Sequence, residues 1–206
     1  KSNYMALHRF LEMLRLNKFK GRLLHISTDE VYGTNLKKTA KEDYPLRPTN
    51  PYSVSKAAAD MLCQTYSKCY DLNILIVRPN NIFGPYQHIE KLIPATINAA
   101  YGGKKLIIHG NGLQKRSFLN SDDFFSACEL LLSKNWDLFN NRVFNISSNN
   151  EYKVIDIIKK IAYFRKVNFE IFSEFGEDRP FNDLRYLISS RSLKSLGWVE
   201  KTSFEK

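Results

Sequence analysis

Several features are scarce in this sequence of 206 residues. Its three cysteines, Cys63, Cys69 and Cys128, are too few for a disulfide framework and favour a reducing compartment, so we expect the cytoplasm. No apolar run approaches the roughly 18 residues of a membrane-spanning helix, and we expect no membrane partner. The four histidines show no metal-ligand spacing, which predicts that the chain has no metal site.

Glycine is scarce where a dinucleotide-binding fold would need it. Such a fold has a Gly-rich turn between its first strand and helix, so that pyrophosphate can approach the backbone. The nine glycines here are scattered, and the segment 110–112, Gly-Asn-Gly, follows a short apolar run without opening a helix. That segment is therefore predicted to be a turn.

The net charge of +10 raises the question of a nucleic-acid partner. The basic residues are spread along the chain rather than gathered on one element with interleaved aromatics. This pattern favours a solvated surface, and some positive charge suits a protein that binds pyrophosphate groups. We expect no nucleic-acid binding.

Two short motifs carry chemistry. An apolar run predicts a strand over 22–28, which would deliver the Thr28 hydroxyl to the rim of a parallel sheet, where open α/β folds bind ligands. Tyr52 and Lys56 are four residues apart and would share one face of a helix over 51–70. The lysine would then favour the ionised phenol and make it a base near neutral pH.

Asp29 and Glu30 directly follow this strand. Two adjacent carboxyl groups can act as an acid and a base when their environments separate their pKa values. They could also be a solvated loop or a pair of charges at a helix N-terminus. Together with the Tyr/Lys pair they suggest redox chemistry coupled to the loss of water.

Strands and helices alternate along the chain, which predicts an α/β fold with a parallel sheet. The expected helices cover 3–17, 51–70, 88–102, 121–134, 153–164 and 191–196. The expected strands cover 22–28, 74–77, 106–109, 143–146 and 168–173, and a polar loop over 34–49 is expected to lie over the site.

Four motifs in order, within 27–33, 50–60, 80–86 and 90–94, closely resemble the nucleotide-sugar 4,6-dehydratases of the extended short-chain dehydrogenase/reductase superfamily. Members of this family act on dTDP-glucose or UDP-glucose, including in rhamnose synthesis. The resemblance runs from about Asn3 to Trp198. Related epimerases and decarboxylases share the Tyr/Lys pair but typically lack the Thr-Asp-Glu triplet.

The resemblance implies the C-terminal part of a Rossmann-like doubly wound parallel sheet and a smaller α/β substrate-binding lobe. Residues 1–110 would be a partial NAD-binding domain and 111–206 mainly the substrate-binding lobe, with elements interleaved. Roughly the first hundred residues of a full-length relative, including the adenosine half of the NAD site, would be missing. We therefore expect the isolated chain to bind NAD poorly and to turn over little or nothing.

The resemblance also implies roles for individual residues. NAD would be the cofactor and a nucleotide-diphosphate glucose the substrate, converted to its 4-keto-6-deoxy form by oxidation, water elimination and re-reduction. The catalytic residues would be Thr28, Asp29, Glu30, Tyr52 and Lys56, and the cofactor contacts Ser27, Tyr52 and Lys56. The substrate contacts would be Thr28, Asn81, Lys91, Leu92, Arg116, Asn145, Arg179 and Asn182.

Two other interpretations stay open. The chain could be an epimerase or decarboxylase of the same fold, or a non-catalytic module that binds a nucleotide sugar. The intact acid, base and phenol favour an enzyme, because a binding module has no use for them. Relatives commonly dimerise through the helix that carries the Tyr/Lys pair, so we expect a homodimer for the full-length protein.

Overall fold

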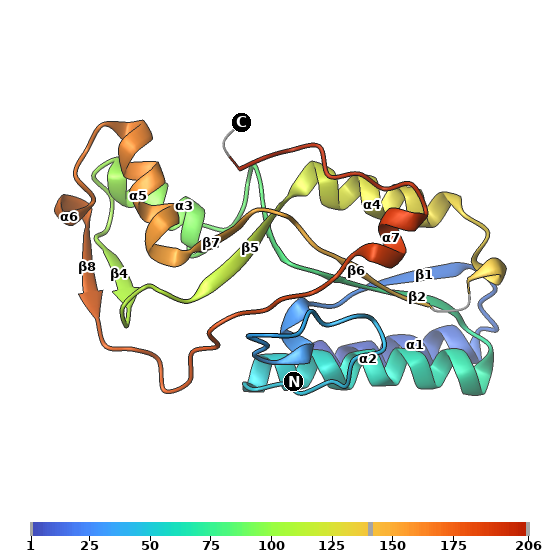
Figure 1. Ribbon diagram of the computed structural model, residues 1–206. Coiled ribbons are helices and arrows are strands. Elements are labelled where there is room, and N and C mark those ends of the chain that lie inside the picture. The colour runs from blue at the N-terminus through green and yellow to red at the C-terminus, as the bar shows by residue number, and fades with distance from the viewer. Residues whose placement is uncertain (1, 140–141, 205–206) are drawn as a thin grey trace.

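The computed structural model describes residues 2–139 and 142–204 (Figure 1). The helices are a π-helical turn, Ser2–Ala6, followed by α1 (Leu7–Leu16), α2 (Pro51–Tyr70), α3 (Leu92–Ala100), α4 (Ser121–Ser133), α5 (Val154–Arg165), α6 (Phe169–Phe172) and α7 (Arg191–Ser195). Two 3₁₀ turns cover Asp29–Tyr32 and Trp136–Leu138. The strands are β1 (Arg22–Ile26), β2 (Asn73–Pro79), β3 (Asn81–Phe83), β4 (Leu106–His109), β5 (Lys115–Asn120), β6 (Val143–Ile146), β7 (Glu151–Lys153) and β8 (Ser173–Gly176).

The larger part of the molecule is built on a parallel sheet with the strand order β1-β2-β6. The sheet lies between α1 and α2 on one face and α4 and α7 on the other (Figure 1). From Ile74 to Pro79 every residue of β2 is buried, as expected for a central strand covered on both faces. The fold class predicted from the alternating strands and helices is therefore confirmed.

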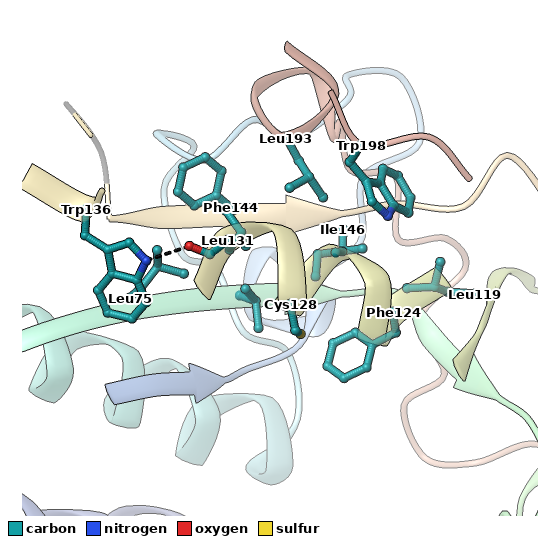
Figure 2. Close-up of a cluster of buried hydrophobic side chains, with 12 residues drawn as sticks. Leu75, Leu119, Phe124, Cys128, Leu131, Trp136, Phe144, Ile146, Leu193 and Trp198 are labelled. Atoms are coloured by element: carbon teal, nitrogen blue, oxygen red, sulfur yellow. Dashed lines mark hydrogen bonds between the residues drawn. The ribbon is translucent and has the colours of Figure 1, made fainter. Parts of the chain in front are cut away.

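The main apolar core fills the space between this sheet, α4 and α7. Phe144 on β6 and Leu193 on α7 belong to it, together with two tryptophans (Figure 2). The indole Nε1 of Trp136 donates to the carbonyl oxygen of Leu131 at 2.7 Å, so its polar atom is satisfied although the ring is buried. This core holds β2 and β6 in place, and the candidate site begins at their carboxyl ends.

A smaller lobe contains the parallel pair β4-β8 and the sheet β3-β5-β7, with α3, α5 and α6 packed beside them (Figure 1). Its parts come from two separate stretches of the chain, because β4 pairs with β8 while β6 returns to β2 in the larger sheet. In each of the three sheets, a strand from residues 1–110 therefore pairs with a strand from residues 111–206.

Local sequence explains why α2 starts where the catalytic motif begins. Asn50 accepts a hydrogen bond from the Ser53 backbone N–H at 2.8 Å, and the Ser53 hydroxyl accepts from the Asn50 N–H at 3.1 Å. This capping box, with Pro51 in the first helical position, places Tyr52 in the first turn of the helix.

Two expectations for the secondary structure were wrong, and three short strands were not predicted. The strand predicted over 168–173 is instead the one-turn helix α6, capped by Asn168, and the strand starts only at Ser173. The helix predicted over 88–102 begins at Leu92, which leaves Pro94 in the first turn, where its missing N–H costs no helical hydrogen bond. The short strands β3, β5 and β7 were not predicted, because they form by pairing between segments that are distant in the sequence, and the alternation of residues within each segment does not indicate a strand.

Candidate active site

A cleft of about 1070 Å³ opens between the carboxyl ends of β1 and β2 and the smaller lobe. Such a position, outside the carboxyl ends of parallel strands, is where open α/β sheets bind ligands. Ten of the thirteen residues predicted for the site line this cleft: Ser27, Thr28, Glu30, Tyr52, Asn81, Lys91, Leu92, Arg116, Arg179 and Asn182. Asp29, Lys56 and Asn145 do not line it.

The 3₁₀ turn at the end of β1 separates the two adjacent carboxyl groups. Thr28 is extended and its Oγ1 accepts a hydrogen bond from the Glu30 N–H at 3.4 Å, which starts the turn. Gly33 ends it with a φ of 70°, and a Cβ at this position would lie 2.1 Å from the carbonyl oxygen of Arg47. The turn points Glu30 toward the cleft and Asp29 toward the interior.

Asp29 is only 2% exposed. Its Oδ2 accepts from the Nδ2 of Asn80 at 2.7 Å, and its Oδ1 accepts from the Thr28 hydroxyl at 3.2 Å. Burial raises the pKa of Asp29 to about 7, and the neighbouring Glu30 adds to this effect. At neutral pH the group can therefore hold a proton, which is what a general acid requires.

Glu30 lies in a more open environment, on the wall of the cleft. The Nδ2 of Asn50, the N-cap of α2, donates to its Oε2 at 3.3 Å. This contact joins the rim of the sheet to the start of the catalytic helix. The two carboxyl groups are thus adjacent in sequence but differ in burial and in partners, as a division into an acid and a base requires.

Tyr52 lines the cleft and is half exposed. The expectation that Lys56 lowers the pKa of this phenol was wrong, because partial burial, Glu30 and Asp29 raise it. The ammonium of Lys56 instead donates to the carbonyl oxygen of Ile26 at 2.7 Å. Burial in turn lowers the pKa of Lys56, against the opposing charge of Asp60.

A buried ionic network lies behind Lys56. Asp60, one helical turn further along α2, is fully buried, and its Oδ2 accepts from the Nε of Arg78 at 2.8 Å. The Nε2 of His25 lies 3.5 Å from the other carboxylate oxygen. Arg78 also donates to the hydroxyl of Tyr32 at 2.6 Å, so the network joins α2, β1, β2 and the 3₁₀ turn.

The structure does not place Asn145 where a substrate contact was expected. Its side chain is fully buried, where its Nδ2 donates to the carbonyl oxygen of Ala40 at 3.2 Å and its Oδ1 accepts from the Tyr32 hydroxyl at 2.8 Å. Because Asn145 lies on β6 and Ala40 lies in the loop 34–49, this amide ties the loop to the sheet. Of that loop only Thr49 lines the cleft, so the loop does not cover the site as expected.

The lobe supplies the basic side chains of the cleft. The guanidinium of Arg116 lies 4.8 Å from the centre of the Tyr186 ring and donates to the carbonyl oxygen of its neighbour Lys115 at 2.8 Å. Arg179 is exposed, and the Nδ2 of Asn182 donates to Asp178 at 2.9 Å. These residues can face an anionic ligand across the cleft from the carboxyl groups.

Sequence reasoning missed several polar residues of the site. Asn80 was quoted only as part of a motif, yet it contacts Asp29 directly. Asn50 was likewise quoted only as part of a motif, yet it caps α2 and contacts Glu30. Other polar residues in the lining are Thr49, Gln87, His109 and Gln114. The signal for Asn80 was its position directly after a strand, and the signal for Asn50 was its position directly before a helix.

Two classes of feature are absent from the part of the chain that the structure describes. Within residues 2–139 and 142–204 no group of three His, Cys, Asp or Glu side chains could hold a metal ion. No helix in the same residues is long and apolar enough to cross a membrane.

Comparisons with known proteins agree with this geometry. The family model for GDP-mannose 4,6 dehydratase matches residues 1–206. A trifunctional UDP-glucose 4,6-dehydratase/UDP-4-keto-6-deoxy-D-glucose 3,5-epimerase/UDP-4-keto-L-rhamnose-reductase of Arabidopsis thaliana is 40% identical, over 100% of this chain and 31% of the relative. The dTDP-D-glucose 4,6-dehydratase of Mus musculus is 38% identical, over 90% of this chain and 53% of the relative.

Solved structures show the same arrangement. The dTDP-glucose 4,6-dehydratase of Bacillus anthracis in complex with NAD has a TM-score of 0.87 and 36% identity, covering 98% of this chain and 64% of that one. A UDP-glucuronic acid 4-epimerase of Bacillus cereus, in complex with UDP-glucuronic acid and NAD, has a TM-score of 0.89 and 25% identity, covering 98% and 63%.

The chain thus spans about a third to a half of the curated relatives named above. The resemblance seen in the four sequence motifs is confirmed by the family match over the whole chain. This protein belongs to the GDP-mannose 4,6 dehydratase family, whose model describes the sequence from end to end.

Proposed function

We propose that the protein containing this chain is an NAD-dependent nucleotide-sugar 4,6-dehydratase that acts on dTDP-glucose or UDP-glucose. The observation that carries this proposal is the pair Asp29 and Glu30 beside Tyr52, with one carboxyl group buried near pKa 7 and the other on the cleft wall. An oxidation alone needs only the phenol. The two carboxyl groups are explained by a second step that removes a proton and a hydroxyl group.

Each residue has a role in this reaction. Tyr52 takes the proton of the sugar's C4 hydroxyl during oxidation, and Thr28 orients that hydroxyl. The new ketone acidifies the C5 proton, which Glu30 removes. Asp29, whose Oδ1 contacts the Thr28 hydroxyl on the cleft, supplies the proton with which the C6 hydroxyl leaves as water. The hydride lost from C4 is returned at C6, Glu30 returns its proton to C5, and the proton taken up by Tyr52 replaces the one lost by Asp29. The net change is the loss of one water.

The residues present fit the nicotinamide end of NAD. The Ser27 hydroxyl is buried and lines the cleft, and among residues 2–139 and 142–204 no group lies within hydrogen-bond geometry of it, so it is available to a ligand. Tyr52 offers a hydroxyl on the same cleft. The ammonium of Lys56 donates one hydrogen bond to the carbonyl oxygen of Ile26 and has two further N–H groups for the cofactor. NAD would supply a reversible hydride acceptor, and its positive ring would offset the carboxyl charges that raise the pKa of Tyr52.

The lobe is proposed to hold the nucleotide diphosphate. Arg116 and Arg179 supply planar donors suited to phosphate oxygens, and Asn81, Lys91 and Asn182 are further polar contacts on the same cleft. Leu92 offers an apolar surface at the start of α3. dTDP and UDP differ by a methyl and a ribose hydroxyl, and both remain candidates.

The mass of the product tests this proposal. The full-length protein is incubated with NAD and either dTDP-glucose or UDP-glucose, and a product lighter by one water is expected. In the variant Glu30→Gln we expect a loss of on the order of 10²–10⁴-fold in rate. The matched control is Glu12→Gln on α1, which lies outside the cleft. A product of unchanged mass would indicate an epimerase and refute the dehydratase.

We also propose that the full-length protein is a homodimer that uses α1 and α2. These helices pack side by side under the sheet (Figure 1). They expose Phe10, Met13, Val54 and Met61, each more than 40% accessible. Met61→Glu should give a monomer in sedimentation analysis, whereas Leu138→Glu, on a 3₁₀ turn elsewhere, should not. A dimer that survives Met61→Glu would count against this face.

A further inference from the structure

The side chain of Asn80 is hydrogen-bonded at both ends, although it does not react in the proposed chemistry. It follows β2 and is only 3% exposed. Its Nδ2 donates to Oδ2 of Asp29 at 2.7 Å, and its Oδ1 accepts from the backbone N–H of Ser148 at 2.9 Å. Its own N–H donates to the carbonyl oxygen of Ile146 at 3.0 Å. The residue therefore connects the ends of two neighbouring strands to the buried carboxyl group.

The Ser148 contact fixes which way the amide points. A backbone N–H can only donate, so the carbonyl oxygen of Asn80 must face it, and the NH₂ group must face Asp29. An oxygen that accepts from an NH₂ group is a poor place for a carboxyl proton. When Asp29 is protonated, its proton is therefore directed to Oδ1, because the Thr28 hydroxyl that donates to this oxygen can turn and accept from it, whereas an NH₂ group can only donate. Thr28 lines the cleft.

We propose that Asn80 is a positioning residue that holds Asp29 by Oδ2 and directs its transferable proton to Oδ1, on the side of Thr28 and the cleft. This inference rests on the proposed function, because it gives Asp29 the role of the acid. Asn81, the next residue, lines the cleft and is proposed to contact the substrate, whereas the amide of Asn80 contacts the buried Asp29.

The charged and titratable groups around Asp29 are few. Burial and the neighbouring Glu30 raise its pKa, while hydrogen bonds from Asn80 and Thr28 and the charge of Arg116 lower it. Tyr52 also interacts with the Asp29 charge. Donation by Asn80 stabilises the ionised form, so its removal should raise the pKa of Asp29 further. A hydrogen bond to a charged group corresponds to a shift of about one pH unit or more.

The first test does not depend on activity. Infrared difference spectra between pH 5 and pH 10 follow the protonated carboxyl band of Asp29, which is assigned by its absence in Asp29→Asn. In Asn80→Leu and in the smaller, polar Asn80→Ser, the midpoint of this band should rise by about one unit. The control is Asn35→Leu, which removes another buried amide whose contacts are both to Leu187. An unmoved midpoint in a folded Asn80 variant overturns the inference.

A second measurement uses the unmodified protein and so does not depend on whether a variant folds. In protein labelled with ¹⁵N at asparagine, the side-chain NH₂ resonances of Asn80 should shift with the same midpoint as the Asp29 band. Those of Asn35 should not move. Asn80 resonances that stay constant through the Asp29 titration contradict the inference.

Kinetics of the full-length protein separate this inference from the proposed function. In Asn80→Ser the alkaline limb of the kcat profile should move up with the Asp29 midpoint, with little change in KM. A structural role alone would lower kcat without moving that limb. If no nucleotide sugar is dehydrated by the unmodified protein, the proposed function fails, while the spectra still decide whether Asn80 orients Asp29.

Discussion

The rim of the large sheet and the smaller lobe both border the cleft, but they hold their residues differently. Asp29, on the rim, is buried and held by Asn80 and Thr28, which come from the ends of two strands. Arg179, on the lobe, is exposed and lies on a loop, where the Asp178 carboxylate accepts from its backbone N–H. The comparison indicates that the groups proposed for chemistry are fixed by a rigid scaffold, whereas those proposed for recognition keep freedom to adapt.

Breaking the buried network behind the rim should have the largest effect. In Asp60→Asn the guanidinium of Arg78, 2% exposed, loses its charged partner in the interior. We expect the free energy of unfolding to fall by about 3–5 kcal/mol at neutral pH, because an uncompensated buried charge remains. Urea denaturation of the two proteins measures this. A loss below about 1 kcal/mol would show that the rim is not held by this pair.

The same variant has a pH signature. Burial opposes the ionisation of Asp60, but His25 and the Arg78 guanidinium outweigh it and lower its pKa below the ordinary 3.8. The stability that this carboxylate adds is therefore present above about pH 4 and is lost as pH falls through the lowered pKa. The deficit of Asp60→Asn should shrink in acid, and a deficit that is constant down to pH 2 would contradict this account.

Asp29→Asn should change stability in the opposite direction. The pKa of Asp29 is raised from 3.8 to about 7, so the stability associated with its protonated form is present below pH 4 and is lost as pH rises through 7. Asparagine stays neutral, so the variant should be more stable than the parent above pH 7, by about 2–4 kcal/mol, and should gain little at pH 4. Its dehydratase rate should fall sharply. If the variant were less stable than the parent at pH 8, the ionised carboxyl group of Asp29 would not be destabilising the folded protein.

Substitutions of exposed residues in the lobe should change the binding of the nucleotide sugar rather than the free energy of unfolding. For Arg179→Gln we expect KM for the nucleotide sugar to rise about 10–100-fold, because one charged donor to phosphate is lost. The free energy of unfolding should change by less than about 0.5 kcal/mol, since the side chain is exposed. Arg191→Gln on α7, also exposed, is the matched control and lies outside the cleft. An unchanged KM would remove Arg179 from the site.

The difference between the two regions also explains how far sequence could predict the structure. The apolar run of β1 and the proline at the start of α2 are local signals, and they predicted the strand and the helix that carry the carboxyl pair and Tyr52. The strands β3, β5 and β7 are set by pairing between distant segments, which local pattern does not record. Asn145 was misplaced for the same reason, because its partners Tyr32 and Ala40 are more than a hundred residues away.

The smallest effect is expected for an ion pair on the lobe. The Nζ of Lys105 lies 2.6 Å from Glu174, a shorter distance than that between Arg78 and Asp60 on the rim. Both lobe side chains are about half exposed, so water screens the pair and their ordering offsets the gain. Glu174→Gln should therefore lower the free energy of unfolding by less than about 1 kcal/mol, and high salt should reduce the effect. If this variant cost as much as Asp60→Asn, burial would not be what distinguishes the rim from the lobe.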